Sequence, residues 1–308
     1  MDKKTNDGIM SIQNLTKVFT TGIINSKHVI AVKDVSFEMY PGTILSLIGE
    51  SGSGKTTIGR MILKLLKPTS GKIMYKGKEI INIKRKSEKK EYYNKVQGIF
   101  QDPFSSFNPL YRVDRVFEHI CNNFLKEEKN KEEKINNALK SVNLNPKRVL
   151  GKFPHQLSGG QLQRLLIARA LLLEVDILIA DELISMLDAS TRIGVLNLLV
   201  DLCKENGMAV LFITHDLNLG YYISDYTMIM HKGRLVEKGR TKKIYEKPVH
   251  PYTKMLLESV PDIGKKWDKN KEFLPEDVLK EINEFYLKNK GKGYEEIEGE
   301  HSVLFSDL

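Results

Sequence analysis

The stretch Thr43–Thr56, TILSLIGESGSGKT, decides the fold of this chain. It opens with the continuous apolar run Thr43–Ile48, which is typical of a strand buried on both faces. A glycine-rich loop follows, and Thr56–Leu66 then shows apolar residues at helical spacing. The octapeptide Gly49–Thr56 fits the pattern G-x-x-x-x-G-K-[ST], in the order of strand, loop and helix that this pattern requires.

The glycine-rich loop is expected to hold the phosphates of a nucleotide. Its glycines let successive backbone N–H groups point at phosphate oxygens, and the following helix adds its positive N-terminal end. Lys55 is expected to reach the β- and γ-phosphates, and Thr56 to hold Mg²⁺. A glycine- and serine-rich turn that merely precedes a helix is the alternative. The residues predicted for the phosphate site are Gly49, Glu50, Ser51, Gly52, Ser53, Gly54, Lys55, Thr56 and Thr57.

Strands and helices alternate along most of the chain. Ile9–Phe19 and Ile30–Met39 alternate apolar and polar residues before the turn at Pro41-Gly42, which predicts a β-rich opening. From Asp102 to about Pro154 the pattern is helical and polar, which we interpret as a helical insertion into an α/β core. The core then resumes, and the alternation implies a largely parallel sheet with helices on both faces. The resumed elements are expected at Gln161–Leu173, Ile177–Ala180, Arg192–Glu205 and Ala209–Thr214.

Two adjacent carboxylates end the expected strand in Ile177–Glu182, ILIADE. Asp181 is placed to hold Mg²⁺ through its water shell. Glu182, one residue on, is the candidate base that accepts a proton from an attacking water. Adjacent acids after a strand are also common as surface residues, so the pair does not identify the site by itself.

The bulk composition fits a globular protein and does not choose its partner. The chain has 308 residues, of which 41% are hydrophobic and 28% charged, enough for one large core plus an appendage. The net charge of +9 favours anionic partners such as nucleic acid, nucleotides or an acidic membrane face. Much of the lysine lies in the mixed-charge runs Lys84–Glu91 and Lys126–Lys134, which indicate solvated faces.

The lengths of the apolar runs and the spacing of the cysteines argue against a membrane-spanning, secreted or metal-binding protein. No stretch approaches the roughly 20 apolar residues that span a bilayer. Met1–Gly8 lacks the apolar segment of a signal peptide, so we expect the chain in the cytosol. Cys121 and Cys203 lie apart without CxxC or metal-ligand spacing, which predicts reduced thiols and no zinc or iron–sulfur site.

Leu157–Gln161, LSGGQ, resembles the signature motif of ABC ATPases. A helix-capping loop would also fit these five residues alone. The order of the motifs resembles the order found in that family over most of the chain. The motifs are, in sequence, the phosphate loop, the glutamine, LSGGQ, the paired carboxylates and the histidine. The resemblance implies an α/β P-loop NTPase core with an N-terminal antiparallel β subdomain, a helical subdomain inserted at about residues 102–158, and a C-terminal extension. We expect the nucleotide-binding domain at residues 8–250 and the extension at 251–308.

The resemblance also implies roles around ATP. Gln101 resembles the glutamine that touches Mg²⁺ and the attacking water, and His215 the histidine that contacts the γ-phosphate and orients Glu182. Phe19 occupies the place of an aromatic that stacks on adenine, and a core position is an equal alternative. In the family, the LSGGQ loop faces the γ-phosphate on a partner's phosphate loop, so ATP is sandwiched between two subunits. The residues implied on this second face are Ser158, Gly159, Gly160, Gln161 and Asp188.

Three segments narrow the resemblance to the oligopeptide, dipeptide and nickel importer branch: Gln101–Pro109, Phe153–Gln161 and His250–Pro261 (HPYTKMLLESVP). It implies an ATPase with ATP and Mg²⁺ as cofactors, powering the uptake of oligopeptide or dipeptide, with oligosaccharide or a nickel or metal chelate as alternatives. The implied partners are a second ABC ATPase subunit in a heterodimer, two transmembrane permease subunits and an external solute-binding protein, with no nucleic acid. The implied location is the cytoplasmic face of the cell membrane.

Several positions depart from the family pattern. Leu183, Met186 and Leu162 replace a usual proline, alanine and arginine. None removes a phosphate, metal or proton-transfer group, so we expect activity to survive with altered packing. The tail has no cysteine, which excludes the C-terminal cysteine cluster of many relatives, and only Tyr294–His301 resembles the family's ending.

Two other functions compete with transport. A soluble ABC ATPase acting on nucleic acid or ribosomes is favoured only by the basic charge, because a second cassette, a long coiled coil and zinc cysteines are all missing from the sequence. A degenerate cassette that binds ATP without hydrolysing it is the other alternative, and the apparent completeness of both half-sites argues against it.

Overall fold

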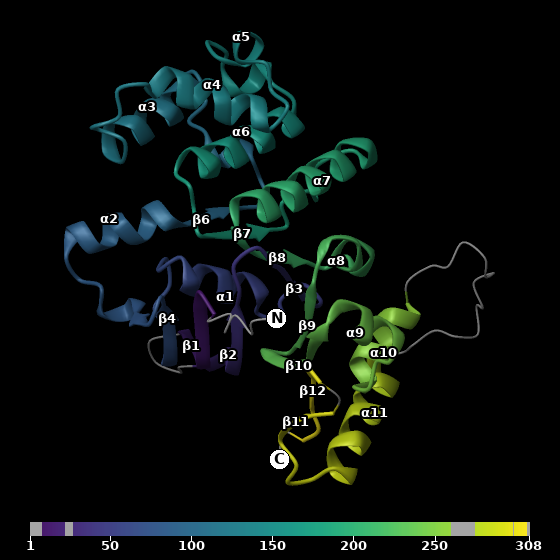
Figure 1. Cartoon of the computed structure of the whole chain (residues 1–308). Helices are drawn as coiled ribbons and strands as arrows, with labels where there is room; N and C mark the ends of the chain where they lie inside the picture. Colours follow the sequence, from purple (N-terminus) through teal and green to yellow (C-terminus); the bar gives the residue numbers. More distant parts are fainter. Residues whose placement is uncertain (1–7, 22–26, 260–274, 298, 307–308) are drawn as a thin grey trace, which may run out of the picture.

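The computed structural model describes residues 8–21, 27–259, 275–297 and 299–306, and two sheets organise them (Figure 1). The N-terminal part forms a four-stranded sheet in the order β2-β1-β4-β5. The remaining strands form an eight-stranded sheet in the order β11-β12-β10-β9-β3-β8-β7-β6. The strands of the smaller sheet are β1 Met10–Thr21, β2 Lys27–Met39, β4 Ser70–Tyr75 and β5 Lys78–Glu79. The larger sheet contains β3 Ile44–Ile48, β6 Val96–Ile99, β7 Ile177–Asp181, β8 Ala209–Thr214, β9 Tyr226–His231, β10 Arg234–Arg240, β11 Tyr294–Glu296 and β12 His301–Leu304.

The smaller sheet is antiparallel, as the family resemblance implies, and its strands lie where the alternating N-terminal sequence predicts them. Strand β1 pairs with both β2 and β4 in antiparallel register. Its residues Met10, Ile12 and Leu15 are buried in one cluster with Leu47 of β3 and Ile58 of the first helix. One face of this sheet therefore packs onto the elements that carry the glycine-rich loop.

The centre of the larger sheet is parallel and buried on both faces. Strands β3, β7 and β8 have every residue buried, which explains their continuous apolar sequences. Strand β3 pairs in parallel with β8 and β9, and β7 pairs in parallel with β6 and β8.

The parallel strands end in register at one edge of the sheet. Ile48 of β3 pairs with Thr214 of β8, Asp181 of β7 with Ile213, and Ile99 of β6 with Ala180. The residues that follow these four strand ends are thereby placed side by side. Ligand sites in open α/β sheets lie at this carboxyl edge. The residues in question are Gly49, Gln101, Glu182 and His215.

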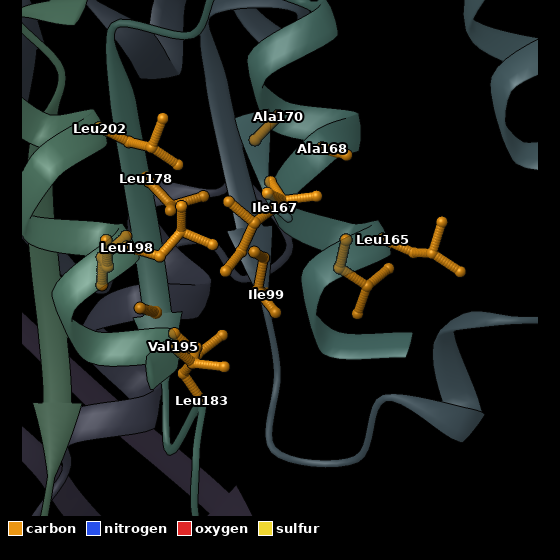
Figure 2. Packing of buried hydrophobic residues seen from close by; sticks show 14 of the residues in the cluster. Ile99, Leu165, Ile167, Ala168, Ala170, Leu178, Leu183, Val195, Leu198 and Leu202 are labelled. Atoms are coloured by element: carbon orange, nitrogen blue, oxygen red, sulfur yellow. The ribbon is translucent and has the colours of Figure 1, made fainter. Parts of the chain in front are cut away.

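Two long helices cover the β6–β7–β8 part of the sheet. Figure 2 shows Ile167 of α6, Leu198 of α7 and Leu178 of β7 within one cluster of apolar side chains. Fully burying such a side chain contributes about 1.5–3 kcal/mol, so this layer fixes both helices on the sheet. The helices are α1 Lys55–Ile62, α2 Lys86–Lys95, α3 Asp114–Asn123, α4 Lys131–Ser141, α5 Pro146–Val149, α6 Gly159–Leu172, α7 Ala189–Asn206, α8 Leu217–Ile223, α9 Thr241–Glu246, α10 Pro251–Glu258 and α11 Pro275–Lys288, with short 3-10 turns at Ile80–Asn82, Phe104–Ser106 and Pro154–Gln156.

Helices α3, α4 and α5 form a lobe with α6 at the top of Figure 1. They lie between β6 and β7 in the chain, where the sequence predicts a helical insertion. Both mixed-charge runs lie largely at the surface, and Cys121 and Cys203 are free buried thiols. Among the helices in the described ranges, none is both long and apolar enough to cross a bilayer.

The C-terminal segment extends the larger sheet. Strand β12 pairs antiparallel with β10, and β11 pairs with β12. Ile282 of α11 and Tyr252 of α10 join a buried cluster with Val236 of β10 and Ile48 of β3. The charged tail sequence did not predict β11 and β12. Of the quoted family segments, Val260, Pro261 and Glu298 lie outside the described residues.

Candidate active site

The glycine-rich loop connects β3 to α1 and fits tightly against neighbouring backbone. A Cβ added at Gly49 would lie 2.2 Å from the carbonyl oxygen of Met230, and one added at Gly54 would lie 2.2 Å from that of Ala31. Gly54 also has a φ of +107°, in the region that favours glycine. Both glycines are thus required by the backbone path that this loop takes.

Lys55 lies buried inside the loop. Its Nζ donates hydrogen bonds to the carbonyl oxygens of Gly49 and Glu50, both at 2.7 Å, and contacts Ser53 Oγ at 3.4 Å. Burial lowers the pKa of Lys55, and the nearby carboxylates of Glu182 and Asp181 oppose that shift. A fixed cation at a helix N-terminus is a site for an anion such as phosphate.

Asp181, at the end of β7, has the chemistry of a ligand for a hard cation. Its side chain is buried, and burial raises its pKa, while a hydrogen bond with the Thr56 side chain lowers it. Its Oδ1 is buried without a hydrogen-bond partner among the described residues. Buried polar atoms without a partner are rare, and Mg²⁺ prefers oxygen ligands of this kind. Asp181 and Thr56 therefore fit a magnesium ion.

Glu182 and His215 meet at the edge of the sheet. His215 Nδ1 lies 3.1 Å from Glu182 Oε1, and their side chains are 61% and 23% exposed, respectively. The backbone of Glu182 has a φ of +48°, and its N–H donates to the carbonyl oxygen of Ile213 at 2.9 Å. A non-glycine residue held in this conformation is strained, and such strain gathers at functional sites. The pair has the geometry of a base and the group that orients it.

Gln101 lies in an exposed bend just after β6. The β6–β7 register places it beside Glu182 along the sheet edge, because Ile99 pairs with Ala180. The structure thus brings four predicted residues, Lys55, Asp181, Glu182 and His215, around one strand edge, with Gln101 at its end. Contact of Gln101 with a metal stays a prediction.

The LSGGQ segment caps helix α6. Ser158 Oγ accepts from the N–H of Gln161 at 3.3 Å, and Gln161 Oε1 accepts from the N–H of Ser158 at 2.9 Å. This capping box starts the helix at Gly159, ahead of the expected start at Gln161. A Cβ added at Gly160 would lie 2.5 Å from Thr191 Cγ2, so the segment packs closely against the start of α7.

Asp188 caps helix α7 and ends the loop that follows the paired carboxylates. Its carboxylate accepts hydrogen bonds from Ser190 Oγ at 2.6 Å and from the N–H of Thr191 at 3.0 Å, which hold its pKa well below the usual range. Arg192 secures the loop, since it donates to the carbonyl oxygens of Leu187 at 2.7 Å and Ser185 at 3.2 Å. Sequence analysis gave Arg192 no role in holding this loop. An arginine in the first turn of a capped helix could have indicated one, because its side chain can reach the carbonyl groups of the preceding loop.

Ser158 and Phe19 make their observed contacts with residues other than those of the glycine-rich loop. No hydrogen bond joins Ser158 to the glycine-rich loop in the described ranges. Phe19 lies on β1, 37% exposed, with Lys17 Nζ 5.1 Å from its ring centroid. Its position on the smaller sheet is compatible with either reading, and adenine stacking stays a prediction.

The departures from the family pattern occupy different environments. Leu162 and Leu183 are buried in the cluster beneath α6 and α7, where they add apolar packing. Met186 is 60% exposed in the loop before α7. These positions hold none of the groups that converge on the strand edge.

Sequence analysis also missed the supports of the glycine-rich loop. The N–H of Gly233 donates to the carbonyl oxygen of Ser53 at 2.9 Å, and Tyr252 Oη accepts from the N–H of Glu50 at 3.3 Å. Tyr252 belongs to the HPYT segment, which the resemblance had marked without giving it a role. These contacts join parts of the chain far apart in sequence.

Together these features define an ATP-hydrolysing cassette. They are the glycine-rich loop with its lysine, the paired carboxylates, the histidine at a strand end and the capped LSGGQ helix. The chain belongs to the ABC transporter family, and within it to the oligopeptide/dipeptide transporter group. The family model described as ABC transporter matches residues 32–185, and one described as oligopeptide/dipeptide transporter, C-terminal region, matches residues 236–286. The predicted family, fold class and ATPase activity are confirmed.

Curated relatives of similar length support this assignment. An oligopeptide transport ATP-binding protein of Streptococcus pyogenes serotype M1 is 44% identical over 255 residues, covering 82% of each chain. One of Bacillus subtilis (strain 168) is 40% identical over 265 residues, covering 85% of this chain and 86% of the relative. A dipeptide transport ATP-binding protein of Lactococcus lactis subsp. cremoris is 42% identical over 257 residues, covering 82% of this chain and 81% of the relative.

Solved structures of ATP-binding cassettes share the fold. A dimeric cassette in a post-hydrolysis state with ADP and phosphate bound has a TM-score of 0.67 at 27% identity, covering 75% of this chain and 98% of the other. A cassette from Clostridium perfringens that is part of an ABC transporter complex also has a TM-score of 0.67 at 27% identity, covering 78% and 92%.

Proposed function

We propose that this chain is the ATP-hydrolysing subunit of an importer that takes up oligopeptides or dipeptides through partner membrane subunits. The C-terminal region match and the peptide-transport relatives support this solute class. Oligosaccharide and nickel or metal-chelate uptake are the alternatives for the same motor.

The observation that carries the proposal is the convergence of Lys55, Asp181, Glu182 and His215 at the edge of the parallel sheet. Lys55 and the loop N–H groups bind the triphosphate, while Thr56 and Asp181 hold Mg²⁺. Glu182 accepts the proton of the attacking water, and His215 holds the Glu182 carboxylate in place. Mg²⁺, when bound, supplies positive charge that neutralises the phosphate oxygens.

We further propose that two such cassettes enclose ATP between the glycine-rich loop of one and the LSGGQ segment of the other. The dimeric state of the ADP- and phosphate-bound cassette that shares this fold supports this arrangement. Ser158, Gly159, Gly160, Gln161 and Asp188 would then form the second face, opposite the partner's loop. We propose a heterodimer with a second ABC ATPase subunit.

We place the assembled pair on the cytoplasmic face of the membrane, bound to two permease subunits that receive solute from an external binding protein. Closure of the ATPase pair would move the permeases, and hydrolysis would reset them. Co-purification of the chain with membranes would support this placement, whereas co-purification with polysomes or DNA would favour the nucleic-acid alternative.

Two measurements test the proposal. The purified chain and its partner subunit should associate when ATP is added, and nucleotide should occupy the seam between them. Capture of the external binding protein, followed by mass spectrometry of its bound ligand, should yield peptides. A sugar or a nickel chelate in that position would reassign the solute, and a lack of nucleotide-dependent association would refute the motor itself.

A further inference from the structure

We propose that Tyr252, in the C-terminal extension, is a positioning residue for the ATP site. Its hydroxyl holds the peptide between Gly49 and Glu50 in the orientation that keeps Lys55 ready to bind phosphate. The proposal rests on the function given above, in which Lys55 binds the triphosphate. It makes the extension, which follows the core cassette in sequence, a part of the nucleotide site.

One peptide unit links Tyr252 to Lys55. The N–H of Glu50 donates to Tyr252 Oη at 3.3 Å, and the carbonyl oxygen of Gly49, in the same peptide, accepts from Lys55 Nζ at 2.7 Å. Because a peptide unit is planar, fixing its N–H also fixes the direction of its carbonyl group. Hydrogen bonds in such a chain polarise and strengthen one another.

The side chain of Tyr252 is itself held rigidly. It is 1% exposed, and its ring lies 4.0 Å from that of His231, which ends β9. The N–H of Tyr252 donates to His250 Nδ1 at 3.2 Å, and the N–H of His250 donates to Glu237 Oε2 at 3.0 Å.

Glu237 connects the contacts around Tyr252 with strand β12 near the C-terminus. It lies on β10 with no exposed surface, and its Oε1 accepts from the N–H of Val249 at 3.0 Å and lies 2.7 Å from His301 Nε2 on β12. A buried carboxylate with three partners is a firm anchor. The sheet edge formed by the tail is therefore connected, through α10, to the phosphate loop.

The test uses Tyr252→Phe in the full chain, because this change removes the hydroxyl and keeps the ring against His231. A single neutral hydrogen bond is worth a change of about 2- to 10-fold in an equilibrium constant. Because this bond also exists in the free chain, that factor is an upper bound for binding, and we expect the dissociation constant for Mg·ATP, measured by titration calorimetry, to rise between about 2- and 10-fold. With the partner subunit present, KM for ATP should rise while kcat at saturating ATP stays within about 2-fold of wild type.

Tyr92→Phe is the matched control. Tyr92 is also buried, and its hydroxyl donates to a backbone carbonyl oxygen, that of Ile62 at 2.6 Å, at the far end of α1 from the loop. It should lower thermal stability without changing the dissociation constant for ATP. An equal rise in both variants would reduce Tyr252 to a general structural role and overturn the proposal.

Hydrogen exchange at the Glu50 amide gives an independent readout. Exchange at this amide should accelerate in Tyr252→Phe and stay at the wild-type rate in Tyr92→Phe. Unchanged exchange together with an unchanged dissociation constant would overturn the positioning role and leave the ATPase function standing. A wild-type chain that binds no ATP would instead refute the proposed function, and this inference with it.

Discussion

Lys55 carries its charge at 5% exposure, with two backbone carbonyl groups around its ammonium. In the proposed complex, phosphate oxygens approach the ammonium alongside these carbonyl groups, in the direction of its third N–H, which now has only Ser53 Oγ at 3.4 Å. Lys55→Ala removes the charge and leaves the loop glycines in place. We expect the dissociation constant for ATP, measured by titration calorimetry, to rise at least about tenfold, because charge-assisted hydrogen bonds contribute about 1.5–3 kcal/mol. Wild-type affinity in this variant would contradict the assignment of the loop.

A substitution of Glu182 distinguishes the binding of ATP from its hydrolysis. Glu182→Gln keeps the shape of the side chain and removes its basicity, so hydrolysis should fall about 10²- to 10⁴-fold while ATP stays bound and the closed pair accumulates. Phosphate release by the chain with its partner checks the rate, and size-exclusion chromatography with ATP checks the pairing. Glu205→Gln, on the exposed face of α7, is the control and should hydrolyse ATP normally. Unchanged turnover in Glu182→Gln would exclude Glu182 as the base.

At the residue scale, sequence predicted what motifs encode locally. Lys55 and Thr56 follow the loop glycines directly, so their spacing marks them, whereas Asp181 and Glu182 follow an apolar strand and needed the neighbouring motifs to be recognised. Tyr252 could not be found in this way, because its partner Glu50 lies 202 positions away in the chain. Such a contact depends on the order of strands in the sheet.

At the element scale, the segments expected as helices or strands around the motifs have the predicted type, whereas the ends of the helices were predicted less well. The helix after the loop was expected to reach Leu66, but α1 ends at Ile62, where the chain turns and Lys64 takes a φ of +55°. Helix α7 begins at Ala189, ahead of the expected Arg192, because Asp188 caps it. Apolar periodicity starts only where a helix meets the core, whereas side-chain caps set the true start.

Helix α10 predicts a pH dependence of stability. Burial lowers the pKa of its cap, His250, to about 3, and that of His231 to about 4. Both are below the usual value near 6.5, so the unfolded chain binds these protons more readily and stability falls as pH drops below about 6.5. His250 alone should reduce the free energy of unfolding by about 2 kcal/mol at pH of about 5.

His250→Asn isolates that contribution. Asparagine can still accept the hydrogen bond at the helix start and does not titrate. Urea unfolding between pH of about 5 and 7 should show a shallower pH dependence in this variant than in wild type, with His231 supplying the remainder. Equal slopes in the two proteins would show that His250 is not the buried neutral group inferred here.

At the scale of the whole molecule, the α/β core and its helical insertion could be predicted, because buried strands and amphipathic helices differ in period. The strands of the tail could not, because β11 is exposed throughout and carries the sequence YEE. Its pairing follows from β12, whose Val303 has no exposed surface. The order of the strands within each sheet likewise cannot be predicted from the sequence of any single segment.

A chain ending before Gly293 tests the role of these strands. It removes β11 and β12, exposes the edge of β10, and takes His301 away from the buried carboxylate of Glu237. We expect a loss of about 3–5 kcal/mol in the free energy of unfolding and a tendency to aggregate, measured by urea unfolding and light scattering. Glu300→Gln, which disrupts an exposed ion pair with Arg240, should cost less than about 1 kcal/mol. Wild-type stability in the truncated chain would contradict the integration of the tail.

The shared register of β3, β6, β7 and β8 has a consequence for how this protein can evolve. Successive residues of a strand point to opposite faces, with a rise of about 3.3 Å. A single in-frame codon gained or lost within β7 would rotate Asp181 and Glu182 out of alignment with Lys55 and His215, even if composition and hydrophobicity were unchanged. Lineages of this cassette should therefore exchange one apolar residue for another in these buried strands while keeping the strand lengths constant.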